Sequence, residues 1–267
     1  MPHALLSPSG SERWINCPGS PNLENGCEQT KTNIYAFEGT IAHALAELIL
    51  KHGPVNSIDD EIKTRIRFKC LKESGLKGKA LTELTKLAYK IRIDRTMLGH
   101  VNTYIDEVKK HFPKYGYIYV EKRVKFYKTF GTVDCITFDG TRDTLYIYDL
   151  KYGKKRVKAK NNPQLAIYGL GALEVFRQFN PNLKLNQFKH ISMNIFQPRI
   201  SKPLSTWELS VKKFKSTWEP RLKAAMDNTE KQQNVFNAGP WCYYCRAWRI
   251  CPTKKEKLQE EARKDFS

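Results

Sequence analysis

The chain has 267 residues, of which 40% are hydrophobic and 12% aromatic, enough for one domain with a sizeable core. Lysine and arginine number 46 against 27 acidic residues, so the formal charge is +19, which favours an anionic polymer as partner over a merely soluble basic protein. No run of about 18 apolar residues and no secretory signal occurs, so we expect an intracellular protein, in the cytoplasm of its host or producing cell, that is neither secreted nor membrane-bound.

The first half of the chain is predicted to be mostly helical. Residues 36–53 carry an apolar stripe at helical spacing and end at a glycine. Residues 58–112 are also helical in pattern and very basic, and their last apolar stripe, at 97–113, ends at a proline. We interpret residues 51–114 as a basic helical insertion and expect it to contact DNA.

Beyond this segment the hydrophobic pattern changes to alternation. Four runs of strand length are predicted, at residues 115–127, 130–140, 144–153 and 188–200. Residues 161–179 predict a helix between the last two strands, with Asn162 as its N-cap and Pro163 as its first residue. A further helix is predicted from Ser210 to Asn228. Strands that surround a helix, with helices before and after, predict an α/β layer fold in a single domain.

The strands at 130–140 and 144–153 raise a question about charge. A hairpin symmetric about their turn places Asp134 opposite Asp149, and strand alternation adds Lys151 to the same mostly buried face. Two such carboxylates repel each other and resist desolvation, so they need a proton, a cation or both. A divalent metal with oxygen ligands satisfies this need, and the alternative is an ordinary Asp–Lys salt bridge at a strand end.

Several motifs occur in the order of a known nuclease family. G-T-V-D followed by Y-D-L-K-Y-G resembles the catalytic core of the PD-(D/E)XK nuclease superfamily, and it is most similar to the RecB-like branch. That branch has a glycine and an aspartate, then D-x-K, then Q-x-x-x-Y on a helix, and the matching residues are Gly131, Asp134, Asp149, Lys151, Gln164 and Tyr168. The branch also has an upstream helix with a metal-binding histidine after a glycine, here His43 after Gly39.

The resemblance implies a restriction-endonuclease-like core, which is a mixed central sheet flanked by helices. The implied core covers about residues 37–50 and 115–200, with the helical insertion at 51–114 and a cysteine segment at the C-terminal end. We expect the whole chain, 1–267, to form one nuclease domain.

The same resemblance implies roles for individual residues. His43, Asp134 and Asp149 would bind one or two Mg²⁺ or Mn²⁺ ions, with the backbone carbonyl of Leu150 as a further ligand. Lys151 would position or activate the attacking water, and Gln164 and Tyr168 would steady the lysine or the phosphate backbone. Two additional acidic candidates are Glu121, for which a surface salt bridge is the alternative, and Glu47. The superfamily pattern has a proline before the first aspartate, which the RecB-like branch often lacks, and here that position is Val133.

Seven cysteines need an explanation in a reducing compartment, where disulfides are rare. Cys242, Cys245 and Cys251 lie within ten residues and require a fourth ligand to close a zinc site or a cubane iron–sulfur cluster. Cys17 is the best candidate and Cys27 the reserve. Cys27, Cys70 and Cys135 otherwise fit small buried or partly buried thiols.

The cysteine pattern resembles the iron–sulfur nucleases of the RecB-like group, which include CRISPR-associated exonucleases and the AddB-type helicase–nuclease subunit. In those proteins one N-terminal and three C-terminal cysteines hold a 4Fe–4S cluster. The resemblance favours a structural 4Fe–4S cluster bound by residues 14–20 and 240–252, with zinc or unligated thiols as alternatives, because spacing alone does not distinguish the metals.

A basic run follows the D-x-K strand. It is expected to bind DNA phosphates at low sequence specificity, with a solvated loop as the alternative, and consists of Lys154, Lys155, Arg156, Lys158 and Lys160. Four aromatic residues crowd the cysteines: Trp241, Tyr243, Tyr244 and Trp248. Shielding of a cluster from water is the favoured role for these rings, and stacking on single-stranded bases is the alternative.

Together these observations predict a metal-dependent DNA nuclease, more specifically an exonuclease acting on linear or single-stranded DNA in recombination, replication or DNA degradation, plausibly encoded by a phage. An endonuclease, a catalytically silent DNA-binding protein with a nuclease fold and a zinc-ribbon RNA-binding protein are the alternatives. The chain has no ATP-binding G-x-x-x-x-G-K-[ST] motif. We therefore expect it to work alone, as a homo-oligomer, or beside a separate recombinase or helicase.

Overall fold

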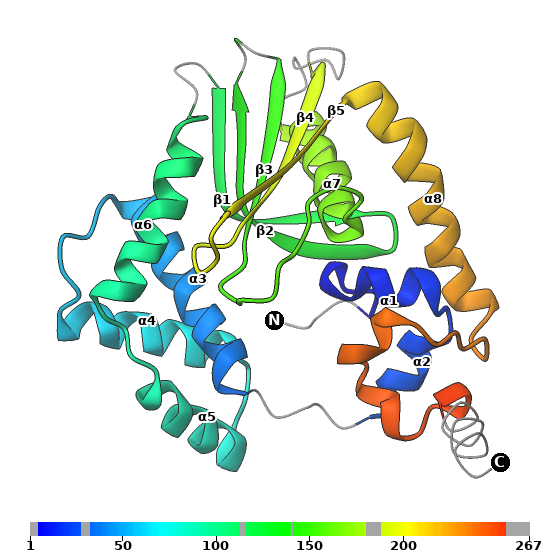
Figure 1. Ribbon diagram of the computed structural model, residues 1–267, viewed down its shortest axis with the longest axis horizontal. Coiled ribbons are helices and arrows are strands. Elements are labelled where there is room, and N and C mark those ends of the chain that lie inside the picture. The colour runs from blue at the N-terminus through cyan, green and yellow to red at the C-terminus, as the bar shows by residue number, and fades with distance from the viewer. Residues whose placement is uncertain are drawn as a thin grey trace.

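A five-stranded mixed sheet forms the centre of the protein (Figure 1). The structure is a computed structural model that describes residues 5–27, 33–112, 116–139, 141, 143–179 and 188–254. The strands lie in chain order across the sheet: β1 (Gly116–Phe126), β2 (Thr129–Asp139), β3 (Thr144–Leu150), β4 (His190–Phe196) and β5 (Leu204–Ser210). Only β3 and β4 are parallel. A parallel pair needs a crossover, and α7 (Pro163–Phe179) lies within it.

Helices cover both faces of the sheet (Figure 1). One face packs against a layer that contains α3 (Ile34–His52), α4 (Asp60–Glu73), α5 (Gly78–Lys90) and α6 (Arg95–Lys109). The other packs against α7, α8 (Val211–Lys231) and the short α1 (Ser11–Asn16). All seven residues of β3 are buried because both faces of this strand are covered. The α/β fold expected from the sequence, a mixed sheet flanked by helices, is confirmed.

Local signals define several element ends. The side chain of Asn33 accepts a hydrogen bond from Ala36 N at 2.8 Å, so α3 begins two residues before the predicted start. Its end at Gly53 is as predicted, and this glycine has the left-handed φ of +97°. The predicted cap of α7 is also correct, since Asn162 Oδ1 accepts from Gln164 N at 2.9 Å and from Leu165 N at 3.2 Å.

The basic helical segment divides into three helices, α4, α5 and α6. The last of them packs on the sheet directly: Tyr104 of α6 is fully buried, and its ring centroid lies 5.9 Å from that of Phe196 in β4. Part of the range predicted as an insertion therefore belongs to the layer that covers one sheet face.

The strand β5 was not predicted from the sequence. Of its seven residues only Trp207 is buried, so its sequence lacks the apolar alternation that marks a half-buried strand. In the sheet β5 pairs antiparallel with β4 alone and forms an edge.

The β2–β3 hairpin has the register expected from a symmetric turn. The ladder pairs Cys135 with Tyr148, so Asp134 and Asp149 are the next residues on the two strands. Residues 140 and 142 of the turn lie outside the described residues. At the other end of β2, the β1–β2 turn reaches α8, where Lys128 Nζ lies 2.6 Å from carboxylate oxygens of both Asp227 and Glu230.

The two ends of the described chain pack together (Figure 1). The short helix α2 (Ser20–Asn25) packs against the 3₁₀ helix η4 (Arg246–Arg249), and α1 packs against the 3₁₀ helix η3 (Pro240–Tyr244). Glu24 of α2 is buried. Its carboxylate accepts hydrogen bonds from Arg13 Nε at 3.1 Å and from Arg246 N at 2.7 Å. Because one side chain bridges segments 222 residues apart, the cysteine segment is held against the N-terminal helices.

Candidate metal and phosphate site

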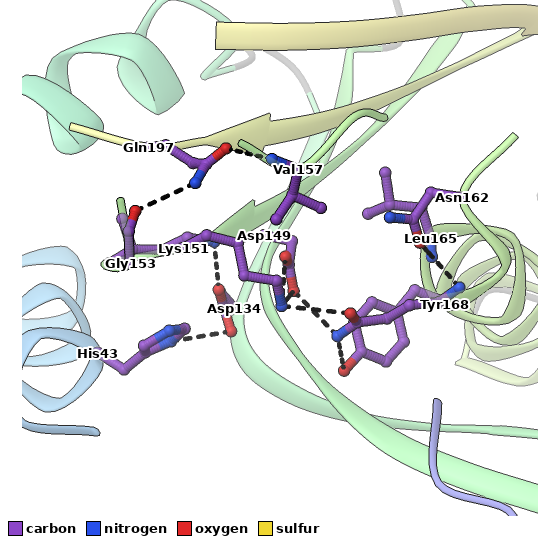
Figure 2. A network of polar contacts seen from close by, with 12 residues as sticks. His43, Asp134, Asp149, Lys151, Gly153, Val157, Asn162, Leu165, Tyr168 and Gln197 are labelled. Atoms are coloured by element: carbon purple, nitrogen blue, oxygen red, sulfur yellow. Dashed lines mark hydrogen bonds and ion pairs between the residues drawn. The ribbon is translucent and has the colours of Figure 1, made fainter. Parts of the chain in front are cut away.

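The carboxylate of Asp134 lies where β2, β3 and α3 meet (Figure 2). One oxygen is 3.2 Å from Nδ1 of His43 on α3, and the other accepts a hydrogen bond from Leu150 N at 2.6 Å. The sequence prediction that His43 and Asp134 share a site agrees with this geometry. The amide of Leu150 contributes through its N–H, and a role of its carbonyl as a metal ligand stays a prediction.

Asp149, at the end of β3, is only 2% exposed and is at the centre of a second set of contacts (Figure 2). Its Oδ1 accepts from Lys151 Nζ at 3.1 Å and from Gln164 Nε2 at 3.3 Å. Its Oδ2 lies 2.8 Å from Lys151 Nζ, but without hydrogen-bond alignment, so this buried oxygen has no hydrogen-bond partner. A buried carboxylate oxygen in this state retains capacity for a cation.

The helix α7 brings the predicted Q-x-x-x-Y pair to the same place. Gln164 accepts a hydrogen bond from Lys151 Nζ at 3.2 Å, and its Nε2 donates to the Tyr168 hydroxyl at 3.1 Å. The two residues are one helical turn apart on the same face. Gln164 thus connects the lysine, the aspartate and the tyrosine, and it fixes the position of the Lys151 ammonium.

Glu121 completes a group of three metal-ligating side chains. One ligand atom each from His43, Glu121 and Asp134 lie within 4.8 Å of one another. Glu121 has a left-handed φ of +50°, and the β1–β2 ladder pairs the residues on either side of it but omits the pair of Glu121 with Asp134. A glutamate in this conformation inside a strand is strained. Within the described chain it forms no ion pair with lysine or arginine, so the salt-bridge alternative does not describe it.

Glu47, the other additional acidic candidate, is placed differently. Its two oxygens lie 2.7 Å from Lys51 Nζ and 2.8 Å from Lys69 Nζ. These ion pairs, helped by the hydrogen bonds in them, outweigh burial and lower the pKa of Glu47. It is not part of the three-residue group.

The electrostatics show that the site carries excess negative charge. Burial raises the pKa of Glu121 to about 8, and the nearby Asp134 adds to the rise. Burial also raises the pKa of Asp149, against the effect of Lys151. Burial alone would lower the pKa of His43. The charge and hydrogen bond of Asp134 outweigh burial and raise this pKa to about 9. Without a cation, the site therefore retains protons at neutral pH that a cation would displace.

The donor set fits a hard divalent cation. Two carboxylates and one imidazole within 4.8 Å are ligands that Mg²⁺ and Mn²⁺ accept, and the Asp149 carboxylate, whose Oδ2 is ion-paired with Lys151, lies on the adjacent strand. A possible metal-binding triad is thus present, with Glu121 in it beside two of the predicted ligands. The nature of the ion remains a prediction.

Two glycines of the predicted motifs behave differently. A Cβ on Gly131 would lie 2.7 Å from Pro8 Cγ and 2.9 Å from Tyr168 Cε1, so only glycine lets the tyrosine ring pack here. A Cβ on Gly39 would meet no atom within 4 Å. The first glycine is therefore required by packing against the site, and the second has no such steric requirement.

Sequence reasoning missed Gln197, which follows β4 and is 1% exposed. Its Oε1 accepts from Val157 N at 2.7 Å, and its Nε2 donates to the carbonyl of Gly153 at 3.1 Å (Figure 2). The same Nε2 donates to the carbonyl of Lys155 at 2.9 Å. It holds the basic loop after Lys151 in place. The sequence contained one indication of this role, because Gln197 directly follows β4 and the ends of the parallel strands β3 and β4 meet at the same edge of the sheet.

The basic loop forms one wall of an open cleft of about 700 Å³. Lys151 lines this cleft together with four of the five predicted DNA-binding residues, Lys155, Arg156, Lys158 and Lys160. The fifth, Lys154, is exposed beside them. None of the five forms an ion pair within the described chain. Residues of α1 and of η3 also line it.

The four predicted cluster cysteines lie in one neighbourhood. Burial raises the pKa of the Cys17 thiol, and the nearby thiols of Cys251 and Cys242 add to this. Burial likewise raises the pKa of Cys245 to about 11, with a contribution from Cys242. Backbone amides donate to two of the sulfurs, Asn237 N to Cys17 and Gly239 N to Cys242, both at 3.4 Å. No three cysteine sulfurs among the described residues lie within 4.8 Å of one another.

The other three cysteines match their predicted character. Cys70 and Cys135 are buried, and Cys27 is half-buried with its thiol donating to Leu23 O at 3.4 Å. Two of the four aromatic residues do not fit the favoured role of shielding a cluster from water. Tyr243 and Tyr244 are 75% and 70% exposed, so their rings do not shield the sulfurs.

The chain matches the model of a family described as a protein of unknown function (DUF2800) over residues 3–267. It therefore belongs to this family. In the described part of the chain, every helix is too short or too polar to span a bilayer.

Proposed function

We propose that this protein is a metal-dependent DNA nuclease of the PD-(D/E)XK type, similar to the RecB-like branch. The observation that carries the proposal is the meeting of the His43–Glu121–Asp134 triad with Asp149 and Lys151 at one end of the sheet, beside a basic cleft. The order of these residues in the chain matches the resemblance described above, and the mixed sheet flanked by helices agrees with a restriction-endonuclease-like core.

The chemistry follows from the charges in the site. A bound Mg²⁺ or Mn²⁺ would polarise a phosphate oxygen and lower the pKa of a water molecule. His43, Glu121 and Asp134 would hold the ion, and the Asp149 carboxylate, which is ion-paired with Lys151, would be a further ligand.

Lys151 acts as a cation and not as a base in this scheme. Burial alone would lower its pKa, but the charge and hydrogen bond of Asp149 outweigh burial and raise it. The ammonium is therefore protonated at neutral pH and donates to a phosphate oxygen or to the attacking water, stabilising the charge that develops. Gln164 keeps it directed toward the site.

The substrate class rests on charge. The chain carries +19, and the cleft that contains Lys151 is lined by seven basic side chains against one acidic, Glu12. We propose linear or single-stranded DNA as substrate and an exonuclease as the activity. A role in recombination, replication or DNA degradation, as a homo-oligomer or beside a separate recombinase or helicase, is part of this proposal.

The test uses end-labelled linear DNA and closed circular DNA, each single- and double-stranded, with Mn²⁺ or EDTA. We expect loss of linear substrate with Mn²⁺ only, and none with Asp149→Asn. The matched control is Asp60→Asn, a change of an exposed aspartate on α4 that should keep full activity. Cleavage of circles would indicate an endonuclease. Intact DNA binding without cleavage of any substrate would indicate a catalytically silent binding protein.

We further propose that Cys17, Cys242, Cys245 and Cys251 hold a 4Fe–4S cluster with a structural role. The thiols of Cys251 and Cys242 lie near Cys17, and the choice of iron–sulfur over zinc rests on the resemblance. The amide hydrogen bonds to two of the sulfurs agree with cluster ligation. Anaerobic purification should give brown protein with iron and sulfide, whereas stoichiometric zinc without iron would refute the cluster.

A further inference from the structure

The cleft beside Lys151 has two chemically different walls. One is the basic loop after β3, whose cations lack acidic partners within the described residues. The other contains η3 of the cysteine segment, which lies beside α1 (Figure 1). Trp241, Tyr243 and Tyr244 of this segment line the same cleft. Cations without acidic partners beside a group of aromatic rings are a combination that binds a polyanion with planar groups.

The two tyrosines are exposed but held in place. Their ring centroids are 4.7 Å apart and the rings are nearly perpendicular, at 82°. Lys155 Nζ lies 4.5 Å from the centre of the Tyr243 ring and 5.7 Å from that of Tyr244. The backbone below them is fixed by the bonds of Cys245 N to Cys242 O and of Arg246 N to Glu24. Rings that are more than two thirds exposed on a fixed backbone can stack on a ligand without a large loss of conformational entropy.

We propose that Tyr243 and Tyr244 are a stacking surface for the unpaired bases of a single DNA strand, whose phosphates lie along the basic loop toward Lys151. This deepens the proposed function, on which it rests, by assigning the substrate form that the cleft accepts. A duplex hides the faces of its bases and offers only phosphates, so the tyrosines discriminate between single and double strands.

The chain offers a matched control for this arrangement. Tyr89 on α5 is 64% exposed and has the guanidinium of Arg67 4.8 Å from its ring centre, which is the same combination of an exposed ring and a cation. Tyr89 does not line the cleft. A general effect of removing an exposed tyrosine would appear in Tyr89→Ala, whereas a cleft effect would not.

The experiment measures binding of the full-length protein, in EDTA and in the Asp149→Asn background, to a fluorescent 20-nucleotide thymidine oligomer and to a duplex of equal length. For the double variant Tyr243→Ala/Tyr244→Ala we expect a loss of single-strand affinity of about tenfold or more, because base stacking contributes about 1–3 kcal/mol per base. Duplex affinity should be unchanged. Two control variants should bind both DNAs as tightly as Asp149→Asn alone. They are Tyr243→Phe/Tyr244→Phe, which keeps the rings, and Tyr89→Ala.

Salt dependence separates the two walls. Lys155→Ala/Lys158→Ala should reduce the slope of log affinity against log salt, whereas the tyrosine variant should retain it. Equal losses for single strand and duplex, or no loss for either, would overturn the inference. Tighter binding of the matching uridine oligomer would overturn the assignment to DNA.

The binding assay also keeps this inference distinct from the nuclease proposal. Tyrosine-dependent single-strand binding, together with no cleavage by the wild-type enzyme, leaves the inference standing and refutes the nuclease. Cleavage of single strands at the wild-type rate by Tyr243→Ala/Tyr244→Ala with Asp149 intact refutes the inference and leaves the nuclease.

Discussion

Substitution of Glu121 by glutamine should make the metal-free protein more stable at high pH. The glutamate is half-buried, strained and next to Asp134, so its charged form is disfavoured. A pKa raised from 4.5 to about 8 means that the folded state binds a proton more tightly than the unfolded state. Because of this, the stability of the wild-type protein falls as pH rises from 4.5 toward 8. Glutamine keeps the shape and removes the charge.

The magnitude follows from the pKa. At 1.36 kcal/mol per pKa unit, the rise corresponds to a ceiling of about 5 kcal/mol above pH 8, and partial solvent access reduces this to about 2–3 kcal/mol. His43 acts in the same direction: its pKa, raised from 6.5 to about 9, gives stability that is present below pH 6.5 and lost as pH rises through 9. Wild-type stability should therefore fall steeply from pH 6 to 9, and that of Glu121→Gln less steeply.

The assay is urea unfolding in EDTA at pH 6, 7, 8 and 9, with Glu61→Gln on an exposed part of α4 as control. The difference between Glu121→Gln and wild type should grow with pH, while the control follows the wild type. With Mn²⁺ the order should reverse, because the variant lacks one ligand and gains less from the ion. A difference that is constant with pH, or a variant that is less stable than wild type at pH 9 in EDTA, would refute the reasoning.

Four other predictions follow from the site. Lys151→Ala should reduce cleavage at least about 100-fold but retain the Mn²⁺-induced rise in Tm, because the lysine is outside the triad; loss of that rise would contradict the assignment. Gly131→Ala should cost about 1–3 kcal/mol through its clash with Pro8 and Tyr168, whereas Gly39→Ala, in open space within α3, should stabilise by about 0.5–1 kcal/mol in the same thermal melts. Mn²⁺ affinity measured by calorimetry should rise with pH from 6.5 to 9, since binding displaces the His43 proton, and a flat profile would show that His43 is no ligand. Gln197→Ala should lower DNA affinity and cost about 2 kcal/mol or more of stability, because it leaves three backbone groups of the basic loop without partners.

Local patterns in the sequence determined the strand pair, the capped helix and the order of the motif residues. The reason is that a strand alternates with period two, so a short turn between two alternating runs leaves one register in which Asp134 and Asp149 are neighbours. In the same way, Asn162 and Pro163 start a helix whose period places Gln164 and Tyr168 on one face. These contacts span few residues and depend on geometry that every chain shares.

Other features were decided only by the tertiary structure. Glu121 enters the site through a left-handed conformation that its strand-like sequence does not indicate, and Gln197 acts on a loop about 40 residues away. The edge strand β5 exists because β4 offers it a partner, not because of its own pattern. The exposure of Tyr243 and Tyr244 depends on where the bridge from Glu24 places the cysteine segment. Such contacts join residues far apart in the chain, and their energies arise only when the layers pack, so no local pattern in the sequence records them.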